Sequence, residues 1–166
     1  MLNAGFAAIS VLNETDAGFF DHMMNADVRG PILQMATLAE MLNPGASVVL
    51  TSSTSAYEGA PMASVYAVTK GAMISMARCW APALGERDIR VNVLAPSPID
   101  TDFRNLMSDD FRNQFEADVI GRLPLRRDES ADEAAAVALF LSLKGLEVAS
   151  CSCYEADKAI YALTMA

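Results

Sequence analysis

The sequence lacks the features that mark membrane, secreted and nucleic-acid-binding proteins. No apolar run approaches the roughly 18 residues of a membrane span, and no basic residues precede the apolar start of the chain, as they would in a signal peptide. Lys and Arg number 12 against 21 Asp and Glu, a formal net charge of -9 that argues against a basic nucleic-acid-binding face. We expect a cytoplasmic protein with neither membrane nor nucleic acid as partner.

Cysteine and histidine are scarce as well. The three cysteines are Cys79, Cys151 and Cys153, and a Cys-x-Cys with no second pair and no neighbouring histidine is a weak metal signal. His22 is the one histidine, and we expect it on an exposed helix face rather than in catalysis. The sequence therefore indicates no metal site and reduced thiols.

Glycine-rich phosphate-binding turns are also missing. The nine glycines include neither a Gly-x-Gly-x-x-Gly nor a Gly-x-x-x-Gly-x-Gly segment. Such a turn at the start of a helix holds the pyrophosphate of a dinucleotide in nucleotide-binding folds. The sequence therefore contains no pyrophosphate cradle of this kind.

What the sequence does contain is the pattern of an α/β protein. Its 166 residues, 52% of them hydrophobic and 20% charged, suit one domain with a sizeable core. Helical periodicity alternates with short β-rich runs, which is typical of a parallel sheet covered by helices. We expect helices over residues 15–42, 62–84 and after a capping box at Ser130 and Glu133, and strands over 46–53, 88–98 and 150–156.

Proline and acidic residues refine two of these segments. Pro31 lies inside the first predicted helix and cannot donate a hydrogen bond to the carbonyl of Asp27, so we expect a kink after Gly30. Asp109 and Asp110 are interpreted as a solvated pair in a loop, although a contact with substrate stays open.

One group of residues has the composition of a catalytic site. Ser53 stands thirteen residues before Tyr66, which stands four residues before Lys70. The Tyr-x-x-x-Lys spacing alone is not specific, because Tyr154 and Lys158 repeat it with a leucine in place of the serine. The serine therefore distinguishes the first group, although Ser53 is also compatible with a plain capping role in the loop after its strand.

The predicted fold would bring this group to one edge of the sheet. Ser53 and Pro96 both follow predicted strands, and ligands of open parallel sheets bind beyond the carboxyl ends of the strands. A phenol has a pKa near 10, and a lysine ammonium within a few ångströms favours the phenolate, so Lys70 is expected to lower the pKa of Tyr66. Tyr66 could then exchange a proton with an oxygen held by Ser53, while a nicotinamide transfers the hydride.

Five segments resemble, in order and spacing, motifs of the short-chain dehydrogenase/reductase family, which has a Rossmann fold and uses a nicotinamide cofactor. The segments are LNAG (2–5), MMNADVRGP (23–31), the Ser53, Tyr66 and Lys70 group, RVNVLAPSPIDTDF (90–103) and GRLPLRRDESADEAAAVALFL (121–141). The resemblance covers nearly the whole chain.

The resemblance implies roles for individual residues. The catalytic residues it implies are Asn25, Ser53, Tyr66 and Lys70, with Asn25 in the proton path and Lys70 also touching the ribose. The cofactor-binding residues it implies are Asn3, Ala4, Gly5, Tyr66, Lys70, Pro96, Ile99 and Thr101. The cofactor is NAD or NADP, because the residue that would discriminate between them follows a strand that the sequence lacks. By itself, Asn25 would instead be interpreted as a solvent-facing helix residue.

The chain also departs from the family pattern. The expected fold is a Rossmann-like parallel sheet flanked by helices and truncated at the N-terminus, a single partial domain over 1–166. Strands five to seven of the family are retained, strands one to three are absent, and strand four is reduced to Met1 and Leu2. Ser97, Arg126 and Ser150 stand where the family usually has glycine, and Lys158 and Ala159 replace another glycine pair.

Three hypotheses about function follow. The first is an oxidoreductase of this family that interconverts a small-molecule alcohol and a ketone, with Tyr66 as general acid and base. The second is a truncated, catalytically idle relative that acts only by subunit association. The third, an unrelated flavodoxin-like binding module, would need anion-binding turns that the sequence does not show. The resemblance also implies a homodimer or homotetramer formed through the helices at 15–42 and 62–84.

Overall fold

A computed structural model describes residues 1–99, 101, 109–144, 150 and 153–155. Three parallel strands form the sheet in the order β1-β2-β3. They are β1 (Ser47–Thr51), β2 (Arg90–Ala95) and β3 (Cys153–Glu155). Each lies inside a segment that the sequence predicted as a strand, so the expected parallel α/β sheet is confirmed. Cys151, Lys158 and Ala159 lie outside the described residues.

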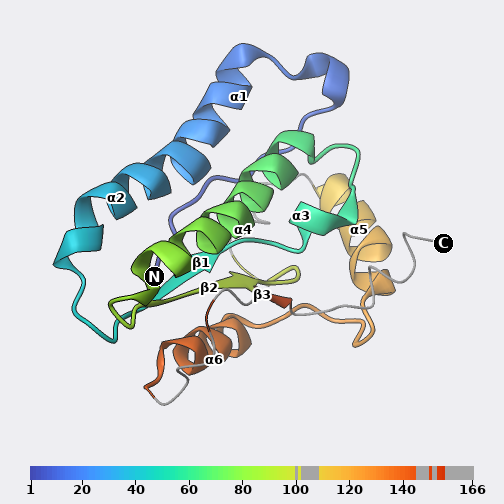
Figure 1. Ribbon diagram of the computed structural model, residues 1–166. Helices are drawn as coiled ribbons and strands as arrows, with labels where there is room; N and C mark the ends of the chain where they lie inside the picture. The colour runs from blue at the N-terminus through green and yellow to red at the C-terminus, as the bar shows by residue number, and fades with distance from the viewer. Residues whose placement is uncertain (100, 102–108, 145–149, 151–152, 156–166) are drawn as a thin grey trace.

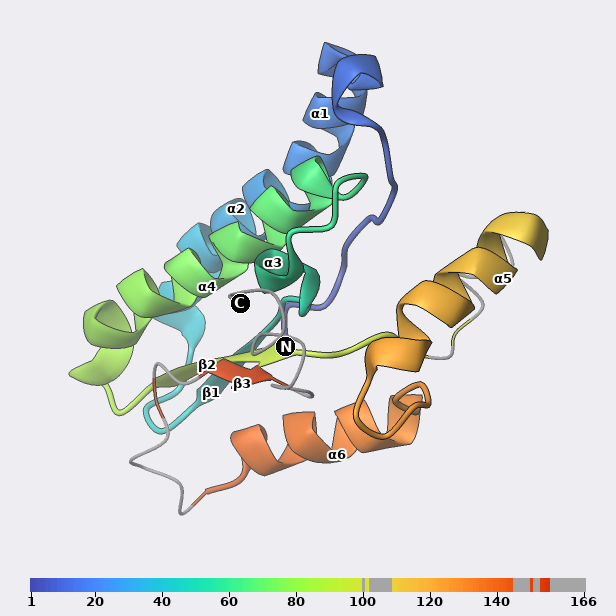
Figure 2. The same ribbon diagram turned by 90° about the vertical axis from the view of Figure 1, so that its right-hand side faces the viewer.

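Helices cover both faces of the sheet (Figures 1 and 2). On one face lie α4 (Ser64–Gly85) and, beside it, α1 (Ala17–Met24) and α2 (Gly30–Leu38). On the other face lies α6 (Ala131–Ser142), whose predicted capping box is present. The polypeptide thus forms three layers, as expected for strands that are apolar on both faces.

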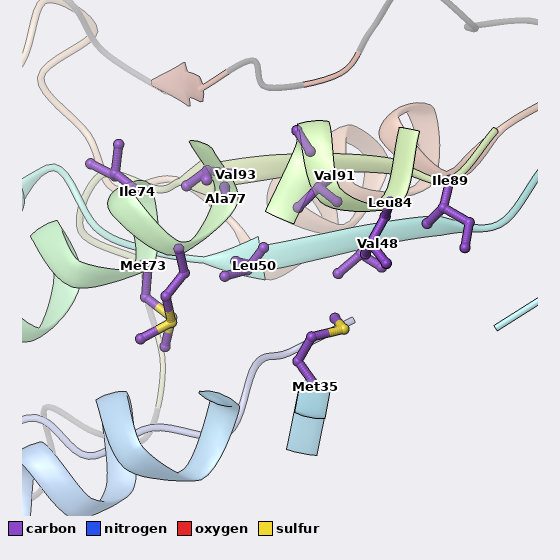
Figure 3. Close-up of a cluster of buried hydrophobic side chains, with 12 residues drawn as sticks. Met35, Val48, Leu50, Met73, Ile74, Ala77, Leu84, Ile89, Val91 and Val93 are labelled. Atoms are coloured by element: carbon purple, nitrogen blue, oxygen red, sulfur yellow. The ribbon is translucent and has the colours of Figure 1, made fainter. Parts of the chain in front are cut away.

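The larger part of the core lies between the sheet and α4. Successive residues of a strand point to opposite faces. Val48 and Leu50 of β1 therefore contact the α4 side, together with Val91 and Val93 of β2, whereas Val49 packs toward α6. Figure 3 shows side chains of α4 and Met35 of α2 directed at this first group.

The first long helix is continuous but changes its hydrogen bonding near Pro31. Between α1 and α2 the chain forms a π-helical turn, η2 (Asn25–Arg29), in which the Gly30 amide donates to the carbonyl of Asn25. A wider turn of this kind relieves the mismatch caused by a proline that lacks an amide hydrogen. The structure thus has a π turn just before the proline, and the kink expected after Gly30 stays a prediction.

Shorter elements complete the described part of the chain. They are η1 (Leu12–Glu14), η3 (Ala39–Met41), α3 (Ser55–Glu58), α5 (Asp109–Asp118) and η5 (Ile120–Arg122). The loop expected at Asp109 and Asp110 was wrong, because both residues, although exposed, form the first turn of α5. Acidic side chains stabilise that end of a helix by interacting with its dipole.

Two backbone features agree with the departures seen in the sequence. Leu2 pairs with Leu50 as an isolated parallel bridge at the edge of β1. Arg126 has a φ of 49°, a left-handed conformation that favours glycine. Among the described residues, no helix has the length and apolar content needed to cross a membrane.

Candidate active site

The carboxyl ends of β1 and β2 lie side by side and form the base of the site. The Ser52 amide donates to the Leu94 carbonyl at 2.8 Å, and the Thr54 amide donates to the Pro96 carbonyl at 3.1 Å. Ser53, between these two residues, is therefore fixed at the sheet edge next to Pro96. This is the edge at which ligands bind in open parallel sheets.

Helix α4 places Tyr66 and Lys70 over this edge. The two residues are four apart and share a helix face, with the Lys70 Nζ 5.3 Å from the centroid of the Tyr66 ring. The Ser53 side chain is hydrogen-bonded to Tyr66. The structure therefore brings together three of the four residues that the resemblance marked as catalytic.

Asn25 stands apart from these three. It opens the π turn, its side chain is exposed, and its backbone carbonyl accepts a hydrogen bond from the Gly30 amide. Within the described residues its side chain makes no hydrogen bond to Ser53, Tyr66 or Lys70. A part for Asn25 in the proton path therefore stays a prediction.

A residue that the sequence analysis did not select occupies the centre of the site. Asp27, two residues after Asn25, is 0% exposed, and its Oδ2 lies 2.9 Å from the Nζ of Lys70. Its position on the helix contained the signal, because Met23, Asp27, Pro31 and Met35 repeat every four residues and are all buried. A carboxylate in such an apolar row requires a partner of opposite charge.

The pKa of Tyr66 is raised above 10, contrary to the lowering expected from Lys70. Burial of the phenol is the largest cause, because a low-dielectric surrounding disfavours the phenolate. The hydrogen bond with Ser53 lowers the pKa, and the negative charges of Asp27 and Glu58 raise it. The expectation failed because burial of the phenol is the largest influence on its pKa and because the Lys70 ammonium is paired with the Asp27 carboxylate.

The residues expected to touch a cofactor lie around this centre. Pro96 is buried, Ile99 half-buried and Thr101 exposed beyond the end of β2. Asn3, Ala4 and Gly5 are exposed in the segment after Leu2, and a Cβ built on Gly5 would lie 3.1 Å from the Lys70 Nζ.

Two of the remaining residues singled out from the sequence have structural contacts. Ser97, at a usual glycine position, donates a hydrogen bond from its hydroxyl to Glu129 Oε2 at 3.3 Å. His22 is exposed, as expected, and its ring meets that of Phe6 edge-on with the centroids 4.4 Å apart.

Comparison with curated proteins finds reductases. A family model described as enoyl-(acyl carrier protein) reductase matches residues 1–156. Versicolorin reductase 1 of Aspergillus parasiticus is 31% identical over 147 residues, which are 88% of this chain and 53% of that protein. The 3-oxoacyl-[acyl-carrier-protein] reductase FabG of Thermotoga maritima is 30% identical over 142 residues, 84% of this chain and 56% of that protein. The chain thus spans about half the length of these relatives.

Solved structures show the same arrangement of elements. A short chain dehydrogenase/reductase family protein superposes with a TM-score of 0.84 at 30% identity, covering 97% of this chain and 66% of the other. The angucycline C-6 ketoreductase LanV, solved with bound NADP, gives a TM-score of 0.87 at 22% identity and covers 96% and 61% of the two chains. Because the family model covers nearly all of the sequence and the fold agrees, the chain belongs to the short-chain dehydrogenase/reductase family of oxidoreductases.

Proposed function

We propose that this chain carries the proton-transfer site of an NAD(P)-dependent oxidoreductase that interconverts an alcohol and a ketone, with Tyr66 as general acid and base. The observation that carries the proposal is the grouping of Ser53, Tyr66 and Lys70 at the carboxyl edge of two parallel strands. Membership of an oxidoreductase family supports it, as do the reductase names of the relatives.

The residues present suit the nicotinamide end of such a cofactor. The Tyr66 hydroxyl and the Lys70 ammonium are donors of the kind that bind ribose hydroxyls, and Ile99 and Thr101 lie beyond the adjacent end of β2. LanV, which shares the fold, is a ketoreductase that binds NADP. Either NAD or NADP is compatible with the described residues. These residues contain no glycine-rich turn that would bind the phosphates.

The protein's own groups act on the proton. A reduced nicotinamide held beside Tyr66 and Lys70 would supply the hydride that the carbonyl carbon takes up in the reducing direction. The Tyr66 hydroxyl donates its proton to the carbonyl oxygen, and the Ser53 hydroxyl holds that oxygen in place by a hydrogen bond. Lys70 stabilises the phenolate that remains until solvent returns a proton, and the oxidation of an alcohol reverses these steps.

The test is carbonyl reduction at millimolar NADPH or NADH, followed by cofactor absorbance. A 3-oxoacyl thioester and an aromatic ketone are suitable substrates. High cofactor concentration is needed because the missing phosphate contacts, each worth about 1.5–3 kcal/mol, should weaken binding by orders of magnitude. Tyr66→Phe should reduce the rate about 100-fold or more, since general acid catalysis contributes at least that factor.

Tyr57→Phe is the matched control. Tyr57 lies on α3 and packs against the core, so removing its hydroxyl should leave the rate of reduction close to that of the parent. A measurable parent rate that Tyr66→Phe leaves unchanged contradicts the role of Tyr66. A folded parent chain that neither binds nor oxidises either nucleotide favours the idle relative, whose expected activity is subunit association alone.

A further inference from the structure

The Asp27 carboxylate is the most deeply buried charge next to the site. The Phe6 amide donates to it at 2.6 Å and the Lys70 Nζ lies 2.9 Å away, while the Thr69 hydroxyl lies 3.2 Å from it and 2.8 Å from the Tyr66 carbonyl. The Lys70 side chain is itself only 8% exposed. Because an unpaired charge in such a place is costly, each of these two residues requires the other.

The Lys70 ammonium lies close to both the Asp27 carboxylate and the Tyr66 ring. Lys70 lies 2.9 Å from the Asp27 carboxylate and 5.3 Å from the Tyr66 ring centroid, so it is paired with the acid first. The charged groups around the phenol come from three elements: Asp27 of η2 and Glu58 of α3, whose charges raise its pKa, and Lys70 of α4, whose Nζ lies near the ring. An ammonium stabilises a phenolate, whereas a carboxylate destabilises it.

We propose that Asp27 is a positioning residue, whose buried carboxylate fixes the Lys70 ammonium beside Tyr66 and sets how strongly that ammonium acts on the phenol. The same carboxylate ties the catalytic helix α4 to the segment that follows Leu2, through the Phe6 amide. The raised pKa of Tyr66 agrees with this arrangement. The inference deepens the proposed function and rests on it, because protonated Tyr66 is the proposed proton donor and the charges of Asp27 and Lys70 act on its pKa in opposite directions.

The experiment is a titration of the Tyr66 phenol by ultraviolet difference absorbance. The signal of the other tyrosines is removed by subtracting the same titration of Tyr66→Phe. Asp27→Asn keeps the shape and an acceptor for Lys70 but removes the negative charge, and should lower the titration midpoint by about one pH unit or more. Lys70→Met should raise the midpoint. In the double variant both charges are gone, and the midpoint should return close to that of the parent.

Thr69→Val is the matched control. It removes the hydroxyl that lies 3.2 Å from the same carboxylate and 2.8 Å from the Tyr66 carbonyl, without changing any charge. Thr69→Val should lower the denaturant midpoint of unfolding and leave the phenol titration midpoint unchanged. If Asp27 had only a structural role, Asp27→Asn would likewise lower stability and leave the phenol midpoint unchanged. An unchanged phenol midpoint in folded Asp27→Asn overturns the proposal. If Asp27→Asn does not fold, equal midpoints in Lys70→Met and the double variant overturn it.

This test is independent of turnover. The titration uses the chain without cofactor or substrate, so a shifted midpoint in a protein that never reduces a ketone supports the positioning role and counts against the proposed function. Turnover that depends on Tyr66, together with an unshifted phenol midpoint in Asp27→Asn, supports the proposed function and overturns the positioning role of Asp27.

Discussion

At the scale of single residues, the site depends on the ion pair of Asp27 with Lys70 and on the space that Gly5 leaves beside that pair. Both side chains are buried, and Gly5 passes directly beside them. Protein interiors are packed so closely that one additional methyl group can lower the free energy of unfolding. Gly5 is therefore part of the structure of the site, although it contributes no side chain.

We expect Gly5→Ala to destabilise the protein by about 1–3 kcal/mol. The added Cβ would lie 3.1 Å from the Lys70 Nζ and 3.3 Å from Asp27 Oδ1, and neither atom can move away without weakening the ion pair. Urea unfolding followed by circular dichroism measures the change.

Gly71→Ala is the control for this substitution. Gly71 lies within α4, and an added Cβ there meets no atom within 4 Å. Replacing a helical glycine by alanine should stabilise the chain by about 0.5–1 kcal/mol. Equal effects of the two substitutions would contradict the packing argument at Gly5.

At the scale of elements, the π turn and the edge of β1 are the two places where the secondary structure is irregular. The π turn contains Asp27, which lies in the same buried row as Met23 and Pro31. On the outer side of β1, pairing within the described residues is limited to Leu2, which accepts from the Thr51 amide and donates to the Val49 carbonyl. An edge strand with so little pairing is open to solvent and to association.

We expect the Val49 amide to exchange with solvent faster than those of Val48 and Leu50. The amide and carbonyl of one strand residue point to the same side, and the Val49 carbonyl points to Leu2, away from β2. Residue-resolved hydrogen exchange by NMR measures this difference, with the Val93 amide of the central strand as the protected reference. Protection of Val49 equal to that of Val48 would show that something else covers the edge.

At the scale of the whole molecule, large apolar side chains remain exposed on α1, α2 and α4. They include Phe20 at 43%, Leu33 at 50% and Val68 at 57% exposure. These helices overlap the two that the family resemblance suggested as a subunit interface. Apolar surface of this kind is typical of protein–protein contacts.

We therefore expect a homodimer or homotetramer in size-exclusion chromatography with light scattering. Leu33→Glu should shift the population toward monomer, because it introduces a charge into the apolar contact. Leu139→Glu is the control, since Leu139 is 63% exposed on α6, on the opposite face of the sheet. A parent chain that stays monomeric at high concentration would refute the expected assembly.

The sequence by itself determined the order and kind of most elements, because apolar periodicity and β-branched runs reflect local geometry. It also identified Ser53, Tyr66 and Lys70, which lie on a strand end and one helix face and so could be placed together without coordinates. The missing glycine-rich turn was readable for the same reason, since it is a local pattern.

Only the tertiary structure decided the electrostatics of the site. Asp27 and Lys70 are 43 residues apart in the sequence, and their ion pair depends on how the π turn and α4 pack against each other. Burial, which raises the pKa of Tyr66, is likewise a property of the packed layers and not of any one segment. Local pattern thus predicted the grouping of Ser53, Tyr66 and Lys70, whereas packing decided that Asp27 joins them and how strongly these groups interact, because packing removes water from between charges.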